Sequence, residues 1–319
     1  MSFRNKIYGA SWLLSLCVLL FSLPALAKAP LYSQSYGNPT DPGLIFLHGG
    51  PGFNSVLFEA STAQDLANQG FYVIVYDRQA EGRSPQRNAE ISLQTATEEL
   101  RTLYQTHGLR QAYLIGHSFG GTVGLHFAQA YPEQVRALIW VGSPLSYPDT
   151  FQTIHRHCKA FYTDQKNSKG LSYLQQLQAM DPGSLNYSGY SFAHALQCGL
   201  YAPKRTTPQA RELYQQAAAA ERQLTYQNPQ TAVQGFYHND HYTQLDLTEQ
   251  LAQTAKQLPV FGIYGTEDGL FDAETLQRLS SILGKSSFYT VPEASHNVFV
   301  DQSDPFIKIL AKIKTEVER

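Results

Sequence analysis

Residues 112–121 read Ala-Tyr-Leu-Ile-Gly-His-Ser-Phe-Gly-Gly, an apolar run that ends in a Gly-x-Ser-x-Gly pentapeptide. Small and apolar residues that suit a helix follow it, from Thr122 to Ala128. A buried strand, a sharp turn at a serine and a helix make up a nucleophile elbow. Glycines on both sides of Ser118 permit the turn, because a Cβ there would clash. The stretch therefore predicts an exposed Ser118 and, at the helix N-terminus, a Phe119 amide that faces developing negative charge.

A second pentapeptide nearly repeats this pattern. Residues 189–193 read Gly-Tyr-Ser-Phe-Ala, but they follow the turn-rich Asp-Pro-Gly-Ser at 181–184 instead of an apolar strand. Short motifs of small residues recur by chance, so their structural context decides between them. We therefore reject Ser191 as the nucleophile and retain Ser118.

Short apolar runs alternate with helical patterns on both sides of the elbow. The expected strands are 31–37, which alternates like an edge strand, 44–47, 71–76, 113–115, 137–141, 260–264 and 287–291. The expected helices are 56–68, 92–106, the segment from the elbow to Tyr131, 273–283 and 304–318. Alternating buried strands and helices predict an α/β fold with a mostly parallel sheet covered on both faces.

The alternation stops between Pro144 and Gln257, where Gln, Ala and Tyr are frequent and one helix is expected at 209–224. We interpret residues 144–257 as a helical cap or lid inserted into an α/β core that comprises 28–143 and 258–319. A chain of 319 residues, 43% hydrophobic and 16% charged, can bury one large core with such an insertion.

Residues 1–27 have the features of a secretory signal peptide. They contain Arg4 and Lys6, no acidic residue, an apolar stretch from 12 to 21, and Ala-Leu-Ala at 25–27. An uncleaved membrane anchor is the alternative, because residues 8–27 are uncharged and long enough to span a bilayer. Pro24 and the small residues favour cleavage, so we expect an exported protein, periplasmic or secreted, without stable membrane insertion.

Charge and cysteine usage narrow the expected partners and compartment. Without residues 1–27 the net charge is about −4, which argues against nucleic acid as a partner. Cys17 leaves with the signal peptide, and an even pair, Cys158 and Cys198, remains. In an oxidising compartment that pair predicts a disulfide. The oligomeric state stays open.

Two further residues complete a candidate site with Ser118. Ligands bind at the carboxyl ends of the strands in such sheets, and Asp268 and His296 each follow an expected strand. The order Ser, Asp, His is the one expected when a nucleophile elbow lies in this kind of sheet. Glu267 is an alternative to Asp268, and so is Asp272, which is also placed to cap the next helix.

Two more segments carry a family resemblance: His48-Gly49-Gly50-Pro51-Gly52, and Tyr-Asp-Arg-Gln-Ala-Glu-Gly-Arg-Ser at 76–84. With the elbow they resemble the proline iminopeptidase-like branch of the α/β-hydrolase superfamily, secreted tripeptidyl peptidases included. The resemblance covers essentially the whole mature chain and is weakest in the lid. It implies a Ser-His-Asp hydrolase that forms an acyl-enzyme, an aminopeptidase of proline iminopeptidase type. It also implies the Gly50 amide as the oxyanion donor opposite Phe119.

Two positions depart from that family pattern. His117 and Phe119 flank the serine where proline iminopeptidases typically have Gly and Trp, and in this they are like those of many esterases and lyase-type relatives. One strand precedes Leu44, where relatives often have two. An esterase or amidase of small lipophilic acyl compounds therefore remains an alternative, as does a non-catalytic ligand-binding protein on the same scaffold.

An aminopeptidase also requires a carboxylate that binds the free amine of its small-molecule or short-peptide substrate. Four lid residues are candidates, and the sequence does not choose between them: Glu212, Glu221, Asp240 and Asp246. Six lid aromatics are candidates to line an apolar pocket, although most are expected in the lid core: Phe161, Tyr190, Phe192, Phe236, Tyr237 and Tyr242.

No cofactor or metal is expected. The chain has no phosphate-binding glycine loop, and the histidines at 155–158 and 238–241 lack the ligand spacing typical of zinc. His117 is interpreted as a structural hydrogen-bonding residue. Asp77 and Arg78 are interpreted as an ion pair that fixes their loop.

Overall fold

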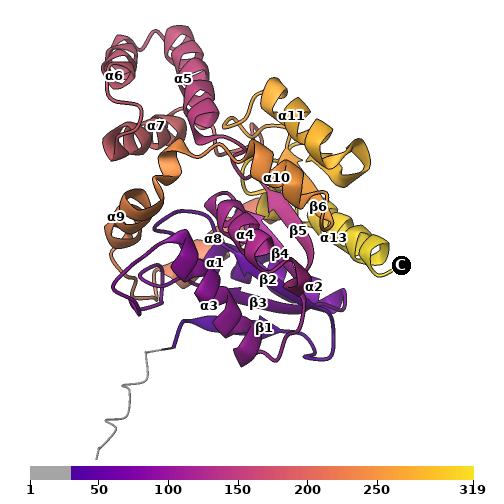
Figure 1. Cartoon of the computed structure of the whole chain (residues 1–319). Helices are drawn as coiled ribbons and strands as arrows, with labels where there is room; N and C mark the ends of the chain where they lie inside the picture. The colour runs from indigo at the N-terminus through magenta and orange to yellow at the C-terminus, as the bar shows by residue number, and fades with distance from the viewer. Residues whose placement is uncertain (1–29) are drawn as a thin grey trace, which may run out of the picture.

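The computed structural model describes residues 30–319, so the predicted signal peptide lies outside the described residues. Seven strands form one sheet in the order β1-β3-β2-β4-β5-β6-β7 (Figure 1). The strands are β1 (Ser33–Tyr36), β2 (Gly43–Leu47), β3 (Tyr72–Tyr76), β4 (Ala112–His117), β5 (Val135–Val141), β6 (Val260–Gly265) and β7 (Phe288–Val291). Strand β1 runs antiparallel to β3, and all other pairs are parallel. The expected mostly parallel sheet is confirmed.

Both faces of the sheet are covered by helices, which is why the central strands are apolar at nearly every position. On one face the strands pack against α3 (Leu93–Thr106), α4 (Phe119–Ala130) and α11 (Ala273–Leu283). On the other they pack against α13 (Ser303–Val317) and a segment of three short helices. That segment comprises α1 (Val56–Phe58), the π-helix η1 (Glu59–Ala63) and α2 (Gln64–Asn68). The edge strand β1 contains no buried residue.

The segment between β5 and β6 is largely helical. Its helices are α5 (Tyr147–Asp164), α6 (Ser168–Gln178), α7 (Leu185–Gln197), α8 (Pro208–Glu221), α9 (Pro229–Asp240), η3 (Tyr242–Gln244) and α10 (Thr248–Thr254). The first three project from the sheet domain at the upper left of Figure 1, whereas α8 packs on α1 and η1, and α10 on α4. Residues 144–257 are called the insertion below, and their role as a lid stays a prediction.

Five helices of the insertion begin at a side chain that caps the helix. Each of these side-chain oxygens accepts a hydrogen bond from a backbone N–H in the first turn. The capping residues are Ser146, Asn167, Ser184, Thr207 and Asn228. Only the helix at 209–224 was expected from the sequence, and it corresponds to α8. The caps are the signal that would have predicted the others.

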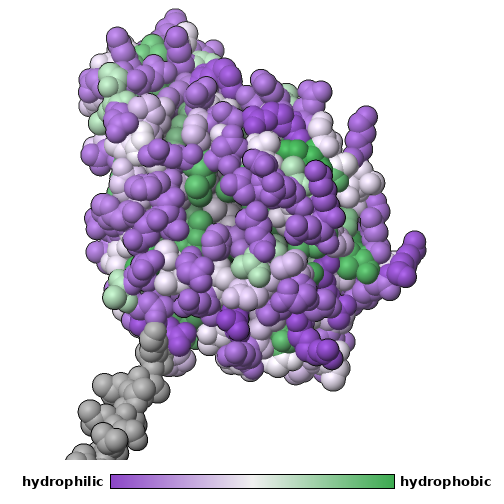
Figure 2. Space-filling view, viewed as in Figure 1, coloured by the Kyte–Doolittle hydropathy of each residue, from purple (hydrophilic) through white to green (hydrophobic). Residues whose placement is uncertain are grey.

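Cys158 of α5 and Cys198, at the end of α7, form a disulfide with their Cα atoms 5.7 Å apart. It ties two helices of the insertion together. Within residues 30–319, no helix combines the length and apolar character needed to cross a membrane. The face of the molecule in Figure 2 is mostly hydrophilic, and apolar side chains gather where the insertion meets the sheet domain.

The elbow and its rejected look-alike give opposite predictions for glycine-to-alanine changes. A Cβ at Gly120 would lie 2.0 Å from the Leu47 carbonyl oxygen, whereas a Cβ at Gly189 in α7 meets nothing within 4 Å. We expect Gly120→Ala to lower the free energy of unfolding by about 3 kcal/mol or more. We expect Gly189→Ala to raise it by about 0.5–1 kcal/mol, because alanine has the higher helix propensity. Urea denaturation checks both, and equal effects at the two sites would contradict the assignment.

Candidate active site

Ser118 occupies the turn between β4 and α4 with φ 52° and ψ −124°. A positive φ is unfavourable for a residue with a Cβ, so the surrounding contacts must impose it. The Ser118 N–H donates to the Val141 carbonyl at 3.0 Å. From residue 112 to residue 125, every residue except Ser118 is buried. The elbow thus presents one hydroxyl at the carboxyl edge of an otherwise buried strand.

His296 and Asp268 form a buried pair at the same edge of the sheet. His296 Nδ1 lies 2.9 Å from Asp268 Oδ2, and Asp268 Oδ1 accepts from the Leu270 N–H at 3.1 Å. A carboxylate oxygen accepts hydrogen bonds, so Nδ1 is the donor of this pair. The arrangement leaves Nε2 as the ring nitrogen that Asp268 does not engage.

The two alternative carboxylates are engaged elsewhere. Glu267 Oε2 accepts from the Lys204 backbone N–H at 2.6 Å. Asp272 caps α11 through the Thr275 N–H at 2.8 Å and pairs with Arg156 at 2.6 Å. Of the three carboxylates considered from the sequence, Asp268 is the one that the structure hydrogen-bonds to His296.

His117 connects the elbow to the His296 loop. Its Nε2 lies 3.1 Å from the His296 carbonyl oxygen, and the two ring centroids are 4.8 Å apart. Burial, and then the nearby His296, hold the pKa of His117 well below its ordinary value. A neutral His117 donates from Nε2 to the carbonyl, so it links the end of β4 to the backbone of His296.

The loop at residues 48–52 lies against the elbow. A Cβ at Gly49 would come within 3.2 Å of Ser118 Cβ, and Gly50 has φ 119°, which favours glycine. The predicted Gly50 amide thus belongs to a loop that reaches the serine. Its role as an oxyanion donor stays a prediction.

Arg78, which is fully buried, fixes this loop through its guanidinium. Its Nη1 donates to the His48 carbonyl and its Nη2 to the Gly49 carbonyl, both at 2.6 Å. Glu81 Oε2 forms an ion pair with Arg78 Nε at 2.5 Å. Glu81 Oε1 accepts a hydrogen bond from the Gly52 N–H, also at 2.5 Å. The pair thereby holds residues 48, 49 and 52 in one arrangement.

The predicted ion pair between Asp77 and Arg78 is wrong. Asp77 pairs with Arg83 at 2.6 Å and accepts from the Ser55 hydroxyl at 2.8 Å. The chain turns after Arg78, with the Glu81 N–H bonded to the Arg78 carbonyl. This turn brings the residue three positions later beside Arg78, which the sequence separation alone did not show.

Aromatic side chains of the insertion pack against Phe119, the residue after Ser118. The Phe119 ring has its centroid 4.9 Å from that of Phe236 and 5.4 Å from that of Tyr242, and all three are buried. Phe161 and Tyr190 are instead exposed, at 38% and 54%. The predicted lid aromatics therefore divide into two that pack near the elbow and others that lie away from it.

The four lid carboxylates proposed to bind an amine each have another partner. Asp240 accepts from the Leu93 N–H at the start of α3, and Asp246 accepts from the Thr248 N–H at the start of α10. The other two accept from amide side chains: Glu221 from Asn54 at 3.4 Å, and Glu212 from Gln216 at 3.3 Å. Asp240 and Asp246 thus each bind a backbone N–H at the start of a helix.

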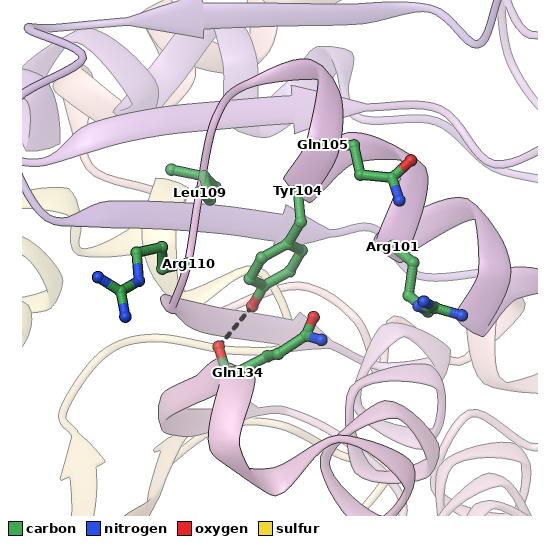
Figure 3. A pocket seen from close by; sticks show the side chains of 6 residues that line it. All are labelled: Arg101, Tyr104, Gln105, Leu109, Arg110 and Gln134. Atoms are coloured by element: carbon green, nitrogen blue, oxygen red, sulfur yellow. Dashed lines mark hydrogen bonds between the residues drawn. The ribbon is translucent and has the colours of Figure 1, made fainter.

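Two cavities lie away from the elbow. One of about 310 Å³ is at the amino ends of β4 and β5, with Arg101 and Arg110 on opposite sides of Tyr104 (Figure 3). The other, of about 390 Å³, lies between α6 and α7. In the part of the chain that the structure describes, no three or more His, Cys, Asp or Glu side chains are grouped to hold a metal ion. The strand-end geometry, and not these cavities, defines the candidate site.

Comparison with known proteins agrees with this geometry. Residues 42–303 match the model of the alpha/beta hydrolase fold family. A proline iminopeptidase of Lacticaseibacillus rhamnosus is 24% identical over 88% of this chain and 92% of its own length. A pimeloyl-[acyl-carrier protein] methyl ester esterase of Vibrio cholerae is 24% identical over 89% and 98%. The solved structure of a proline iminopeptidase-related protein from Thermus thermophilus superposes with a TM-score of 0.65 at 20% identity, over 88% and 92% of the two chains. The chain belongs to the α/β-hydrolase family, a family of hydrolytic enzymes, and is similar to its proline iminopeptidase-like branch.

Proposed function

We propose that this hydrolase acts through an acyl-enzyme formed on Ser118. The observation that supports this most is the 2.9 Å pair of His296 Nδ1 and Asp268 Oδ2 at the sheet edge where Ser118 is half-buried and its neighbours in the chain are buried. His296 Nε2 takes the hydroxyl proton as Ser118 attacks the substrate carbonyl, and Asp268 stabilises the resulting imidazolium. His296 then protonates the leaving group, and water releases the acyl group by the same steps in reverse.

The tetrahedral intermediate needs donors for its oxyanion. We assign the Phe119 amide at the start of α4 and the Gly50 amide of the loop fixed by Arg78. The Phe119 ring packs against Phe236, and the loop that carries Gly50 is fixed by Arg78. Both proposed donors therefore belong to well-packed segments. Preorganised donors of this kind lower the barrier without reorganising during the reaction.

Two substrate classes are compatible with this chemistry, and the site favours esters or amides of small apolar acyl groups. All four lid carboxylates considered as amine binders accept a hydrogen bond from another group, and the insertion contributes aromatic rings near the elbow. An N-terminal prolyl peptide is the second candidate, favoured by the sequence at 48–52 and by the relatives named proline iminopeptidase.

We also propose that the protein acts in an oxidising compartment after export. The disulfide between Cys158 and Cys198 supports this, because such bonds persist outside the reducing cytosol. Cleavage after residue 27 is part of the same proposal.

A substrate panel with a Ser118→Ala control tests the function. We expect p-nitroanilides of short apolar acyl groups to be hydrolysed with a kcat/KM at least tenfold above that of prolyl p-nitroanilide, which carries the same leaving group. Ser118→Ala should lower kcat by about 10⁴-fold, because the nucleophile is lost. Faster cleavage of the prolyl amide, abolished by N-acetylation, would instead support the aminopeptidase. Residual activity within tenfold of wild type would exclude Ser118 as the nucleophile.

The Arg78 and Glu81 pair predicts a separation of stability from activity. Removing one partner leaves the other charge buried, so Arg78→Met should lower the free energy of unfolding by about 3–5 kcal/mol. The double variant Arg78→Met/Glu81→Leu should be more stable than Arg78→Met, since Glu81 no longer leaves an unpaired buried carboxylate. Its kcat should stay at least 100-fold below wild type, because the loop at 48–52 loses its donors. Denaturation and steady-state kinetics measure the two effects, and a double variant with wild-type kcat would show that the loop does not need the guanidinium.

A further inference from the structure

Three aromatic rings enclose the His296 imidazole. The centroid distances are 4.8 Å to His117, 5.1 Å to Tyr201 and 6.4 Å to Phe271. His117 ends a central strand and Phe271 follows β6, so both belong to the sheet domain. Tyr201 is contributed by the insertion, and its ring meets the imidazole edge-to-face at 83°. This arrangement is a favourable one for aromatic pairs.

Tyr201 lies in residues 198–204. This segment also forms hydrogen bonds to the loops that carry Asp268 and His296. The Leu200 carbonyl accepts from the Gly269 N–H at 2.9 Å and from the Ser295 hydroxyl at 3.3 Å. The Lys204 N–H donates to Glu267 at 2.6 Å. A Cβ at Gly269 would lie 2.8 Å from the Leu200 side chain, so the two chains are in close contact. We call residues 198–204 the covering segment.

The disulfide fixes the upstream end of the covering segment. Cys198 is its first residue, and the bond attaches it to Cys158 of α5. Helix α5 is itself joined to the Asp268 loop, because His157 Nδ1 lies 2.8 Å from the Gly269 carbonyl. The helix, the disulfide and the covering segment thus form one connected support that ends on the His296 ring.

We propose that Tyr201 is a positioning residue for His296 and that the Cys158–Cys198 disulfide keeps it in place, which makes hydrolysis dependent on the oxidation of this pair. This inference rests on the proposed role of His296 as the base. The ring restricts the imidazole to one orientation and shields its pair with Asp268 from water. Burial, followed by the Asp268 carboxylate, raises the pKa of Tyr201, so its hydroxyl stays neutral beside that carboxylate.

Reduction would release this support. A dithiol reagent donates two electrons and two protons, so the Cys158–Cys198 bond becomes two thiols and the reagent closes to its own cyclic disulfide. The covering segment then keeps its hydrogen bonds to Gly269, Ser295 and Glu267 but loses its covalent link to α5. Tyr201 is three residues from the released end, so its ring is then held on His296 only through the hydrogen bonds of Leu200 and Lys204, and we expect its orientation to be less restricted.

Truncation of Tyr201 tests the positioning role. We expect Tyr201→Ala to lower kcat by about 10- to 100-fold with KM within threefold of wild type, because a misplaced base slows the chemical step without weakening binding. Tyr201→Phe, which keeps the aromatic ring, should have a kcat within threefold of the wild-type value. Tyr190→Ala is the matched control, an exposed tyrosine of the insertion, and should match wild type. A change of KM alone, or no effect of Tyr201→Ala, would overturn the proposal.

Reduction and its controls test the role of the disulfide. Treatment of the wild-type protein with dithiothreitol should reproduce the loss of kcat, and reoxidation should reverse it. The Cys158→Ala/Cys198→Ala variant should have low activity that no longer responds to the reagent. Reduction of Tyr201→Ala should cause little further loss, because both changes remove the same support. Circular dichroism of each sample excludes unfolding as the cause, and full activity of the reduced, folded protein would contradict the proposal. A wild-type protein without any hydrolytic activity would refute the proposed function instead.

Discussion

The unfavourable backbone of Ser118 is the constraint on which the rest of the site depends. A positive φ at a residue with a Cβ costs about 1–3 kcal/mol and persists only where neighbouring structure imposes it. Two close contacts do so here. Gly120 lies against the Leu47 carbonyl. Gly116 lies so near Gly121 that a Cβ on Gly116 would come within 2.5 Å of the Gly121 Cα. The sheet therefore bears the strain that brings the serine hydroxyl out of a buried strand.

The other parts of the site converge on this point from separate segments of the chain. The Arg78 and Glu81 pair fixes the loop before the elbow, and His117 joins the elbow to the His296 backbone. The insertion adds Tyr201 from the far side, through the covering segment and its disulfide. A buried ion pair is a costly way to hold a loop. This cost is consistent with the proposed role of the Gly50 amide as an oxyanion donor, because such a donor must be held in a fixed position.

Much of the architecture was predictable from the sequence because its signals are local. The apolar runs predicted where the strands lie. The order of Ser118, Asp268 and His296 indicated which strands end at residues of the candidate site. The choice of Asp268 over Glu267 and Asp272 was not local, because it depends on which carboxylate the Lys204 amide and the α11 cap already engage. The partner of Arg78 and the contact of Tyr201 with His296 likewise required the three-dimensional turn of the chain. Four of the five capped helices of the insertion were missed although their Ser and Asn caps are visible in the sequence.

The central proposal is that the strained Ser118 is the activated nucleophile among the serines of residues 30–319. Its most direct test is reaction of the native protein with a fluorophosphonate, followed by mass spectrometry of the digested product. The account predicts a single adduct on the peptide that contains Ser118, and no adduct after unfolding in urea, because activation requires His296 and Asp268 in place. An adduct on the peptide that contains Ser191, or no adduct on the folded protein, would contradict it.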